Sequence, residues 1–246
     1  MEKLNYQLLK PDFIKRLGLI VLQTDETIED EMRFYFKDQT ISLLLSRIPF
    51  ESEVNAATLK QMESYLGQSM SLFPLEAEFD AFAYACTSGA MQIGSKKIAA
   101  LVSETRLCHY VTDPLNSAIA ALKSINVNNI VFLAPYSKKV STSMMDFLSN
   151  KNIKIVSSAI YDEPLDNYVA RISPQTIQRD AIKLVQNNPD VDAIFIPCTN
   201  LKCAHIIPQI EAQTNIPTIS SNQVLAWDLA RQIGLRLGAD KGLLCQ

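Results

Sequence analysis

The chain of 246 residues is 48% hydrophobic and 20% charged, a composition that is ordinary for a globular protein with a sizeable core. Its net charge of −3, without a basic block, gives no reason to expect binding to nucleic acid. The first residues hold no sustained apolar segment, and no stretch approaches the roughly 18 apolar residues of a membrane span, so we expect a cytoplasmic protein without a signal peptide or membrane contact.

Short apolar segments rich in Val and Ile alternate with helical segments along the chain, which is typical of an α/β fold with parallel sheets. In chain order, strands are predicted over residues 17–22, 41–48, 80–85, 108–111, 129–134, 153–160, 192–197 and 216–220. Helices are predicted over residues 54–70, 114–125, 173–188 and 222–234. Asp113, Ser173 and Asn222 stand where a capping side chain would begin the last three helices.

The second half of this pattern repeats the first with a constant offset. Three predicted strands recur after 112 residues, with Leu17 corresponding to Asn129, Ile41 to Ile153 and Asp80 to Asp192. We therefore expect two pseudo-symmetric, four-stranded parallel-sheet halves, residues 1–112 and 113–225, with the active site in the cleft between them. Residues 226–246 are expected to form a terminal helix and tail that pack back on the N-terminal half.

Two cysteines, Cys86 and Cys198, are separated by the same 112 residues, and each follows an apolar strand and precedes a threonine. Ligands of open α/β sheets bind beyond the carboxyl ends of the strands, where the N-terminus of a following helix favours a thiolate. Two thiols on opposite sides of one cleft can act as base or nucleophile and as acid. The alternative is that both are plain core residues, since free cysteine is among the most buried residue types.

The other three cysteines, Cys108, Cys203 and Cys245, have no such setting, and we expect them to be structural. An odd number of cysteines in a reducing compartment argues against a disulfide framework. The C-x4-C pair and the two histidines follow no metal-ligand pattern, and the glycine-rich phosphate motifs are absent from the sequence. Neither a metal nor a cofactor is expected.

Six segments occur in an order that resembles the aspartate/glutamate racemase superfamily: "LGLIVLQTDETIEDE", "ACTSG", "LAPY", "DNYVARISP", "PCTNL" and "SSNQVLAW". The chain is most similar to the branch of maleate cis-trans isomerases and arylmalonate decarboxylases, over nearly its whole length. The resemblance implies a cofactor-independent isomerase or racemase that acts on a small carboxylate substrate, and a homodimer.

The resemblance also implies roles for particular residues. Cys198 would be the nucleophilic thiolate and Cys86 the facing proton donor. Tyr136 would bind the substrate by a hydrogen bond, and Asn167 would hold a carboxylate. Alternatively, Tyr136 only ends a strand and Asn167 only caps a turn. The substrate would also be bound by the residues that follow each cysteine, which are Thr87, Ser88, Thr199 and Asn200. These four could serve only as helix caps.

Asp25 departs from the pattern of the resemblance, because maleate isomerases carry an Asn at its place. An ionised carboxylate accepts hydrogen bonds but repels a substrate carboxylate, whereas an amide can donate to one. Asp25 could accept a hydrogen bond from a substrate ammonium or amide N–H, which favours an amino acid or an N-acyl amino acid as the substrate. The loop is similar to that of the ectoine-utilisation proteins of the same superfamily. Alternatively, Asp25 caps the helix that follows.

Two other functions stay open at this stage. An arylmalonate-type decarboxylase typically keeps one of the two thiols, so the presence of both favours isomerisation or racemisation. A two-lobed protein that binds a small ligand without reacting needs hydrogen-bond donors rather than a pair of nucleophiles.

Overall fold

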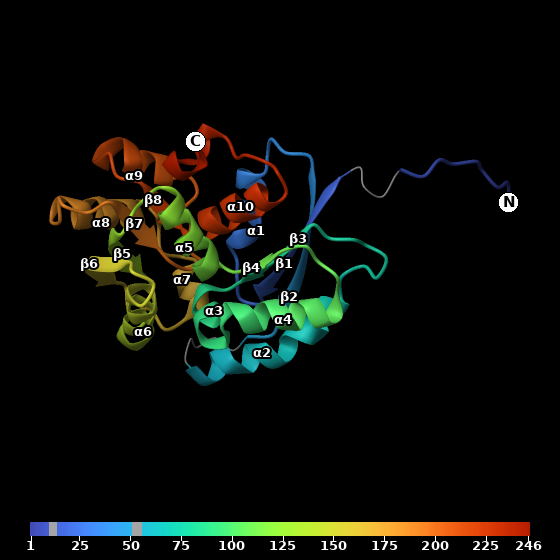
Figure 1. The fold of residues 1–246 in the computed structure, drawn as a ribbon, viewed down its shortest axis with the longest axis horizontal. Coiled ribbons are helices and arrows are strands. Elements are labelled where there is room, and N and C mark those ends of the chain that lie inside the picture. The colour runs from blue at the N-terminus through green and yellow to red at the C-terminus, as the bar shows by residue number, and fades with distance from the viewer. Residues whose placement is uncertain (10–13, 51–55) are drawn as a thin grey trace.

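The computed structural model describes residues 1–9, 14–50 and 56–246. Within these residues, eight strands form two four-stranded parallel sheets, in the orders β2-β1-β3-β4 and β6-β5-β7-β8 (Figure 1). The strands are β1 Lys15–Leu22, β2 Ile41–Ile48, β3 Ala81–Ala85, β4 Val111–Thr112, β5 Asn129–Ala134, β6 Lys154–Ile160, β7 Ala193–Ile196 and β8 Thr218–Ser220. The identical strand order confirms the repeat of four strands that the 112-residue spacing predicts.

The helices connect these strands as parallel sheets require. They are α1 Ile28–Tyr35, α2 Ala56–Ser71, α3 Thr87–Ile93, α4 Ser95–Thr105, α5 Pro114–Ser124, α6 Lys138–Ser149, α7 Asp166–Val169, α8 Pro174–Gln186, α9 Ile207–Thr214 and α10 Ser221–Gln232. Two short 3-10 helices, Ala239–Lys241 and Leu243–Cys245, follow α10. No helix of the described residues is long and apolar enough to cross a membrane.

One carboxylate fixes the start of the central strand in each sheet. Asp80, just before β3, accepts a hydrogen bond from the Arg16 N–H (2.8 Å) and donates its own N–H to the Arg16 carbonyl (2.9 Å). Asp192, just before β7, makes the same pair of bonds with Asn129 (3.0 and 2.8 Å). Asp80 and Asp192, which correspond across the repeat, therefore make the same pair of bonds in the two sheets, although Asn129 lies one residue beyond the position that corresponds to Arg16.

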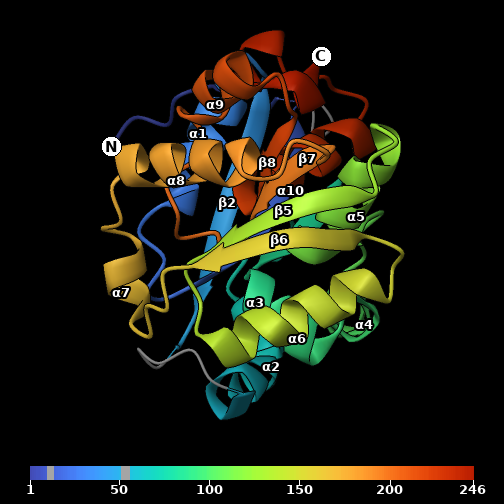
Figure 2. The ribbon, with the colours of Figure 1, turned by 90° about the vertical axis from the view of Figure 1, so that its left-hand side faces the viewer.

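Residues of β1 alternate between two cores, as the period of two in a strand requires. Leu17, Leu19 and Val21 pack with α1 and α10, whereas Ile20 and Leu22 pack with α2, α3 and α4. The first sheet is therefore covered on both faces, and the helix that follows the last strand of the second sheet, α10, covers one of them (Figure 1). Helices α5, α6, α8 and α9 pack on the second sheet, and in Figure 2 α8 lies above β5 and β6 and α6 lies below them.

The predicted helix starts are correct in two of three cases. Asp113 caps α5 by accepting from two backbone N–H groups (both 3.0 Å), and Ser173 caps α8 with Pro174 at its first turn. Asn222 does not cap α10, because Ser220 accepts from the Gln223 N–H (3.3 Å) and begins the helix instead. The prediction for Asn222 was wrong because β8 runs directly into α10.

The predicted strand over residues 108–111 is largely wrong. Strand β4 comprises Val111 and Thr112, and Cys108 contributes only an isolated bridge with Phe79. Pairing is limited by the partner, since β3 begins at Ala81 and its first residue paired with β4 is Phe82.

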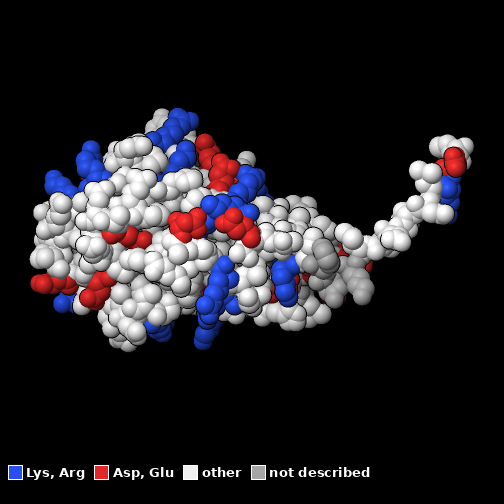
Figure 3. All heavy atoms as spheres, turned by 90° about the horizontal axis from the view of Figure 1, so that it is seen from above, with Lys and Arg blue, Asp and Glu red and all other residues white. Residues whose placement is uncertain are grey.

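The surface that Figure 3 shows carries basic and acidic side chains interspersed over the body of the molecule, without a large area of one sign. The N-terminal segment extends away from this body (Figures 1 and 3).

Gly18 and Gly67 give a matched test of the packing. A Cβ on Gly18 would lie 2.0 Å from the ring of the fully buried Phe82, whereas a Cβ on Gly67, in α2, would meet nothing within 4 Å. We expect Gly18→Ala to lower the free energy of unfolding by about 1–3 kcal/mol through overpacking. Gly67→Ala should raise it by about 0.5–1 kcal/mol because alanine is the better helix former. Urea denaturation measures both, and an unchanged midpoint in Gly18→Ala would contradict the packing around Phe82.

Candidate active site

Cys86 lies between the end of β3 and the first turn of α3, where it is buried. Its Sγ accepts a hydrogen bond from the Gly89 N–H (3.3 Å) and lies 3.7 Å from the Ser88 Oγ. A Cβ on Gly89 would approach the Tyr84 hydroxyl to 2.4 Å and Sγ to 3.1 Å. Glycine is therefore needed for the backbone to come so close to the thiol.

Cys198 follows β7 and is also buried, but its backbone has a φ of 128°. That left-handed region is sparsely populated by residues other than glycine, and holding one there costs about 1–3 kcal/mol. A hydrogen bond from the Cys198 N–H to the Ser221 Oγ (3.0 Å) stabilises this strained conformation. Strained backbone is concentrated at functional sites, and here it sets the position of a thiol.

The two cysteine loops contact each other reciprocally. Ser221, whose Oγ binds the N–H of Cys198, also hydrogen bonds the Thr87 hydroxyl (2.7 Å). In the opposite direction, the Thr199 hydroxyl donates to the carbonyl of Ala85 (3.4 Å), which directly precedes Cys86. The sequence did not single out Ser221, although it follows a predicted strand as both cysteines do.

Tyr136 follows β5 and lies close to both thiols. Burial raises the pKa of its hydroxyl well above the usual range, and the charges of Cys198 and Cys86 raise it further, while the Thr87 side chain opposes the shift. A phenol that interacts with both cysteines and remains protonated is a hydrogen-bond donor at the centre of the site.

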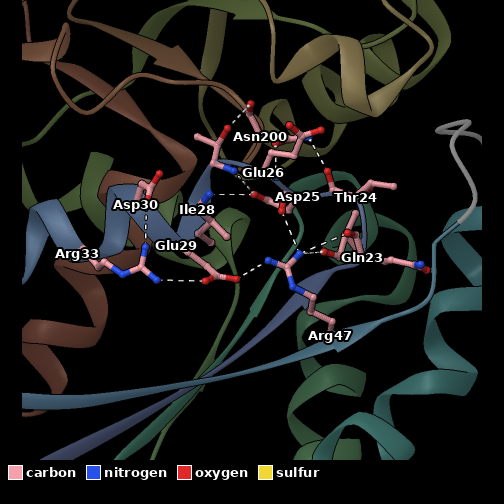
Figure 4. A network of polar contacts seen from close by, with 12 residues as sticks. Gln23, Thr24, Asp25, Glu26, Ile28, Glu29, Asp30, Arg33, Arg47 and Asn200 are labelled. Carbon is pink, nitrogen blue, oxygen red and sulfur yellow. Dashed lines mark hydrogen bonds and ion pairs between the residues drawn. The ribbon is translucent and has the colours of Figure 1, made fainter.

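Asp25 follows β1 and begins α1, so the predicted capping role is present. Its Oδ1 accepts hydrogen bonds from the N–H groups of Thr27 (2.9 Å) and Ile28 (2.8 Å), and its carbonyl accepts from Arg47 (3.0 Å; Figure 4). The carboxyl is 3% exposed, and burial raises its pKa against the influence of the two N–H donors.

Asn200 joins the Asp25 loop to the second half of the chain. Its amide oxygen accepts from the Glu26 N–H (2.9 Å), and its amide nitrogen donates to Asp166 (3.0 Å to the carbonyl, 3.1 Å to Oδ2). The side-chain amide of Asn200 is thus occupied within the protein. The backbone N–H of Asn200 instead interacts with the Cys198 thiol, whose pKa it lowers.

Asp166, at the start of α7, is a site residue that the sequence did not reveal. It accepts a hydrogen bond from the Thr24 hydroxyl (2.6 Å), and burial raises its pKa to about 6. Its neighbour Asn167, the residue expected to hold a carboxylate, is half-buried and makes no hydrogen bond that the structure shows among its described residues. No local signal distinguishes the two, because the contact that matters reaches from Asp166 to Thr24.

Both thiols have raised pKa values, contrary to the expectation that helix N–H groups would favour a thiolate. Burial raises the pKa of Cys86 to about 12, although the Gly89 N–H and the Ser88 hydroxyl oppose it. Burial, followed by the charge of Asp166, raises the pKa of Cys198 well above the ordinary thiol value. Desolvation outweighs the donors at both cysteines and favours the protonated thiol.

Behind the cysteines, buried polar groups hold the loops in place. Glu31 accepts from the N–H groups of Cys203 and Ala204 and from the Asn222 amide, and burial raises its pKa to about 7. The Asn222 amide also donates to the carbonyl of Thr199 (2.8 Å). Asn222 therefore supports the cysteine loop rather than a helix end.

A cavity of about 250 Å³ lies beside the Asp25 loop. It is lined by Glu26, Thr27, Asp30, Glu31, Pro174, Lys202 and His205. Neither Cys86 nor Cys198 is among these residues, so the candidate site is assigned from the side-chain contacts of the cysteines. Within the described part of the chain, no group of three or more His, Cys, Asp or Glu side chains could hold a metal ion.

Comparisons with known proteins agree with this architecture. The chain is similar to the maleate isomerase of Geobacillus stearothermophilus, with 19% identity over 234 residues that cover 90% of this chain and 92% of the relative. It shares its fold with the crystal structure of the maleate isomerase Iso from Pseudomonas putida S16 (20% identity, TM-score 0.84, 94% and 98% coverage).

A second structure of the same fold is a mutant of the Nocardia farcinica maleate cis-trans isomerase with a covalently bound succinylcysteine intermediate (16% identity, TM-score 0.83, 94% and 98% coverage). The family model described as arylmalonate decarboxylase matches residues 91–243, which is more than half of the chain. The protein therefore belongs to the arylmalonate decarboxylase family.

Proposed function

We propose that the protein is a cofactor-independent isomerase or racemase in which Cys86 and Cys198 act on a small carboxylate substrate. The observation that carries this proposal is that two buried thiols stand on equivalent loops that hydrogen bonds join, from Ser221 to Thr87 and from Thr199 to the Ala85 carbonyl, with the buried Tyr136 side chain beside them. Thiols placed only for packing need no shared phenol and no strained backbone at one of them. The succinylcysteine of the Nocardia farcinica enzyme gives a precedent in this fold for a covalent cysteine adduct.

In the cis-trans reaction, the Cys198 thiolate forms a C–S bond to one carbon of the substrate double bond, and the electron pair moves to the neighbouring carbon and its carboxylate. Rotation about the resulting single bond and expulsion of the thiolate give the other isomer. In racemisation, one thiolate removes a proton from the α-carbon and the opposite thiol donates its proton to the other face. Elimination restores the Cys198 thiolate, whereas racemisation leaves the two cysteines with their protonation states exchanged, ready for the opposite enantiomer until a proton is passed back.

The protein groups around the thiols suit both reactions. Tyr136 donates a hydrogen bond to the substrate, as do the backbone N–H groups of Thr87, Ser88, Thr199 and Asn200, while Asn167 is the proposed partner of a carboxylate. Candidate substrates include maleate, amino acids and N-acyl amino acids. In this proposal, residues 1–112 and 113–225 form the two halves, and residues 226–246 pack against the first half. The protein acts in the cytoplasm as a homodimer.

A second candidate is decarboxylation of an arylmalonate-type substrate, which the family match favours. One thiol would protonate the carbanion that remains after loss of carbon dioxide. That reaction needs only one of the two cysteines, so the single variants separate the candidates.

Cys86→Ala and Cys198→Ala should each lower the rate by about two to four orders of magnitude, because each removes a proton donor or nucleophile. The measurement is proton NMR in D2O with maleate, aspartate, glutamate and Nα- or Nγ-acetyl-diaminobutyrate as separate substrates. Cys108→Ala, outside the site, is the matched control and should keep full activity. Full activity in either site variant would rule out the two-thiol mechanism.

The pH dependence of alkylation tests the protonated state of Cys86. Because its pKa is raised to about 12, the thiolate fraction at neutral pH is small and grows with pH until that value is reached. We expect alkylation of Cys86 by iodoacetamide, followed by peptide mass spectrometry, to accelerate about tenfold per pH unit above neutrality. Glutathione provides the control of ordinary pKa. If the alkylation rate of Cys86 stopped rising at a lower pH than the rate of glutathione, the raised pKa would be contradicted.

A further inference from the structure

Two buried carboxylates, Asp25 and Asp166, lie together beside the cysteine pair. Asp25 is 3% exposed and Asp166 is 5% exposed, and they come from the loop after β1 and from α7. Hydrogen bonds hold them together: Asp166 accepts from the Thr24 hydroxyl (2.6 Å) and from the Asn200 amide (3.1 Å), and the amide oxygen of Asn200, two residues after Cys198, accepts from the N–H that follows Asp25 (2.9 Å). The charges of both carboxylates also act on the two thiols. The two thiols and the two carboxyls therefore form one cluster.

No cation is paired with either carboxylate among the described residues. Arg47, whose charge acts on Asp25, donates to the carbonyls of Leu22 and Asp25 and to the carboxylate of Glu29 (Figure 4). Asp166 is bound by the neutral side chains of Thr24 and Asn200. Buried charges are normally paired, so this cluster has an excess of negative charge that the described residues leave uncompensated.

One carboxylate oxygen of the cluster accepts no hydrogen bond that the structure shows among its described residues. Oδ1 of Asp25 is taken by the N–H groups that begin α1, but Oδ2 is buried and makes no hydrogen bond with a described residue. The Thr199 hydroxyl is close enough to lower the pKa of Asp25, but it donates to the carbonyl of Ala85. Leaving a buried acceptor unpaired costs about 1–3 kcal/mol, so an external donor at Oδ2 would be favourable.

We propose that Asp25 and Asp166 bind a cationic group, such as an ammonium, which the substrate carries in addition to the carboxylate held beside the cysteines. This inference rests on the proposed function, because it takes the cleft between the cysteines as the substrate site. An ammonium supplies donors to Asp25 Oδ2 and Asp166 and neutralises the cluster. A dicarboxylate would instead add a third negative charge, so the pair selects against maleate.

Cation binding would also help to activate the thiols. The charges of Asp25 and Asp166 raise the pKa of both cysteines, and a bound cation offsets those charges. Deprotonation of a thiol is therefore easier when the substrate is in place. In this scheme, one set of carboxylates both selects the substrate and restricts thiolate formation to the complex.

The test compares pairs of ligands that differ at one end only: glycine with malonate, β-alanine with succinate, and 4-aminobutyrate with glutarate. Calorimetric titration of the wild-type protein should show binding at least about tenfold tighter for the amino acid of the best-binding pair, as expected for a charge-assisted hydrogen bond. If the dicarboxylate of the best-binding pair bound as tightly as the amino acid or more tightly, the inference would be overturned.

Asp25→Asn and Asp166→Asn should each reduce the preference for the amino acid over the dicarboxylate by about tenfold, because each removes one negative charge while keeping the shape of the side chain. Asparagine still caps a helix, and Asp25→Ser is a second uncharged capping variant should the first fold poorly. Asp30→Asn, on the exposed side of α1 where Asp30 pairs with Arg33, is the matched control and should keep the wild-type preference. A preference retained in both site variants would also overturn the inference.

Binding and turnover separate this inference from the proposed function. Cys86→Ala and Cys198→Ala should keep the preference for the amino acid while losing turnover. If the proposed function were wrong, the preference would stand without any thiol-dependent reaction. If the inference alone were wrong, thiol-dependent turnover would be found with dicarboxylates, and Asp25→Asn would not improve it.

Discussion

The hydroxyl of Ser221 is the contact on which the geometry of the cysteine pair depends. It binds the backbone of Cys198 and the side chain of Thr87 at once, and it stands at the junction of β8 and α10. Parallel strands end at the same edge of a sheet, which brings the loops after β7 and β8 together, and the bond from Ser221 to Thr87 joins them to the loop after β3 of the other sheet. Because α10 then crosses to the first sheet, the same short segment connects the two halves and fixes both thiols.

Electrostatics in the site is governed by burial. The donors around each thiol, which are backbone N–H groups and hydroxyls, lower the thiol pKa, but desolvation acts in the opposite direction and is larger. The same holds for Asp25, Asp166 and Glu31, whose carboxyls all have raised pKa values. Burial therefore shifts every acidic group of the site toward its protonated form, and the chemistry of the site depends on what a ligand adds to that balance.

The sequence predicts the fold well because the fold is periodic. Buried parallel strands are continuous apolar runs, and the recurrence of such runs after 112 residues predicts two equivalent sheets without any knowledge of contacts. The weakest strand prediction fell on residues 108–111, where the length of a strand is set by its partner. Asn222 was misread for a similar reason, since a polar residue near a helix start is a cap only if the chain turns there.

The candidate site was predictable only where its residues end strands. Cys86, Cys198, Asp25 and Tyr136 follow apolar runs that are visible in the sequence, whereas Asp166 lies in a short helix and joins the site through a contact with Thr24, 142 residues away. The side-chain partners of Asn200 were not predictable either, because its amide bonds Glu26 and Asp166 from two other segments of the chain. Side-chain partners of this kind depend on the assembled loops, and no local pattern specifies them.

The positive φ of Cys198 has a consequence for how this chain can evolve. Any residue with a Cβ experiences the same strain at that position, and only glycine is free of it. Selection for stability alone would therefore drive position 198 toward glycine, with a gain of about 1–3 kcal/mol. Under the proposed mechanism, a thiol there is maintained by selection against that drift, and a lineage that no longer needed it could gain stability by replacing Cys198 with glycine.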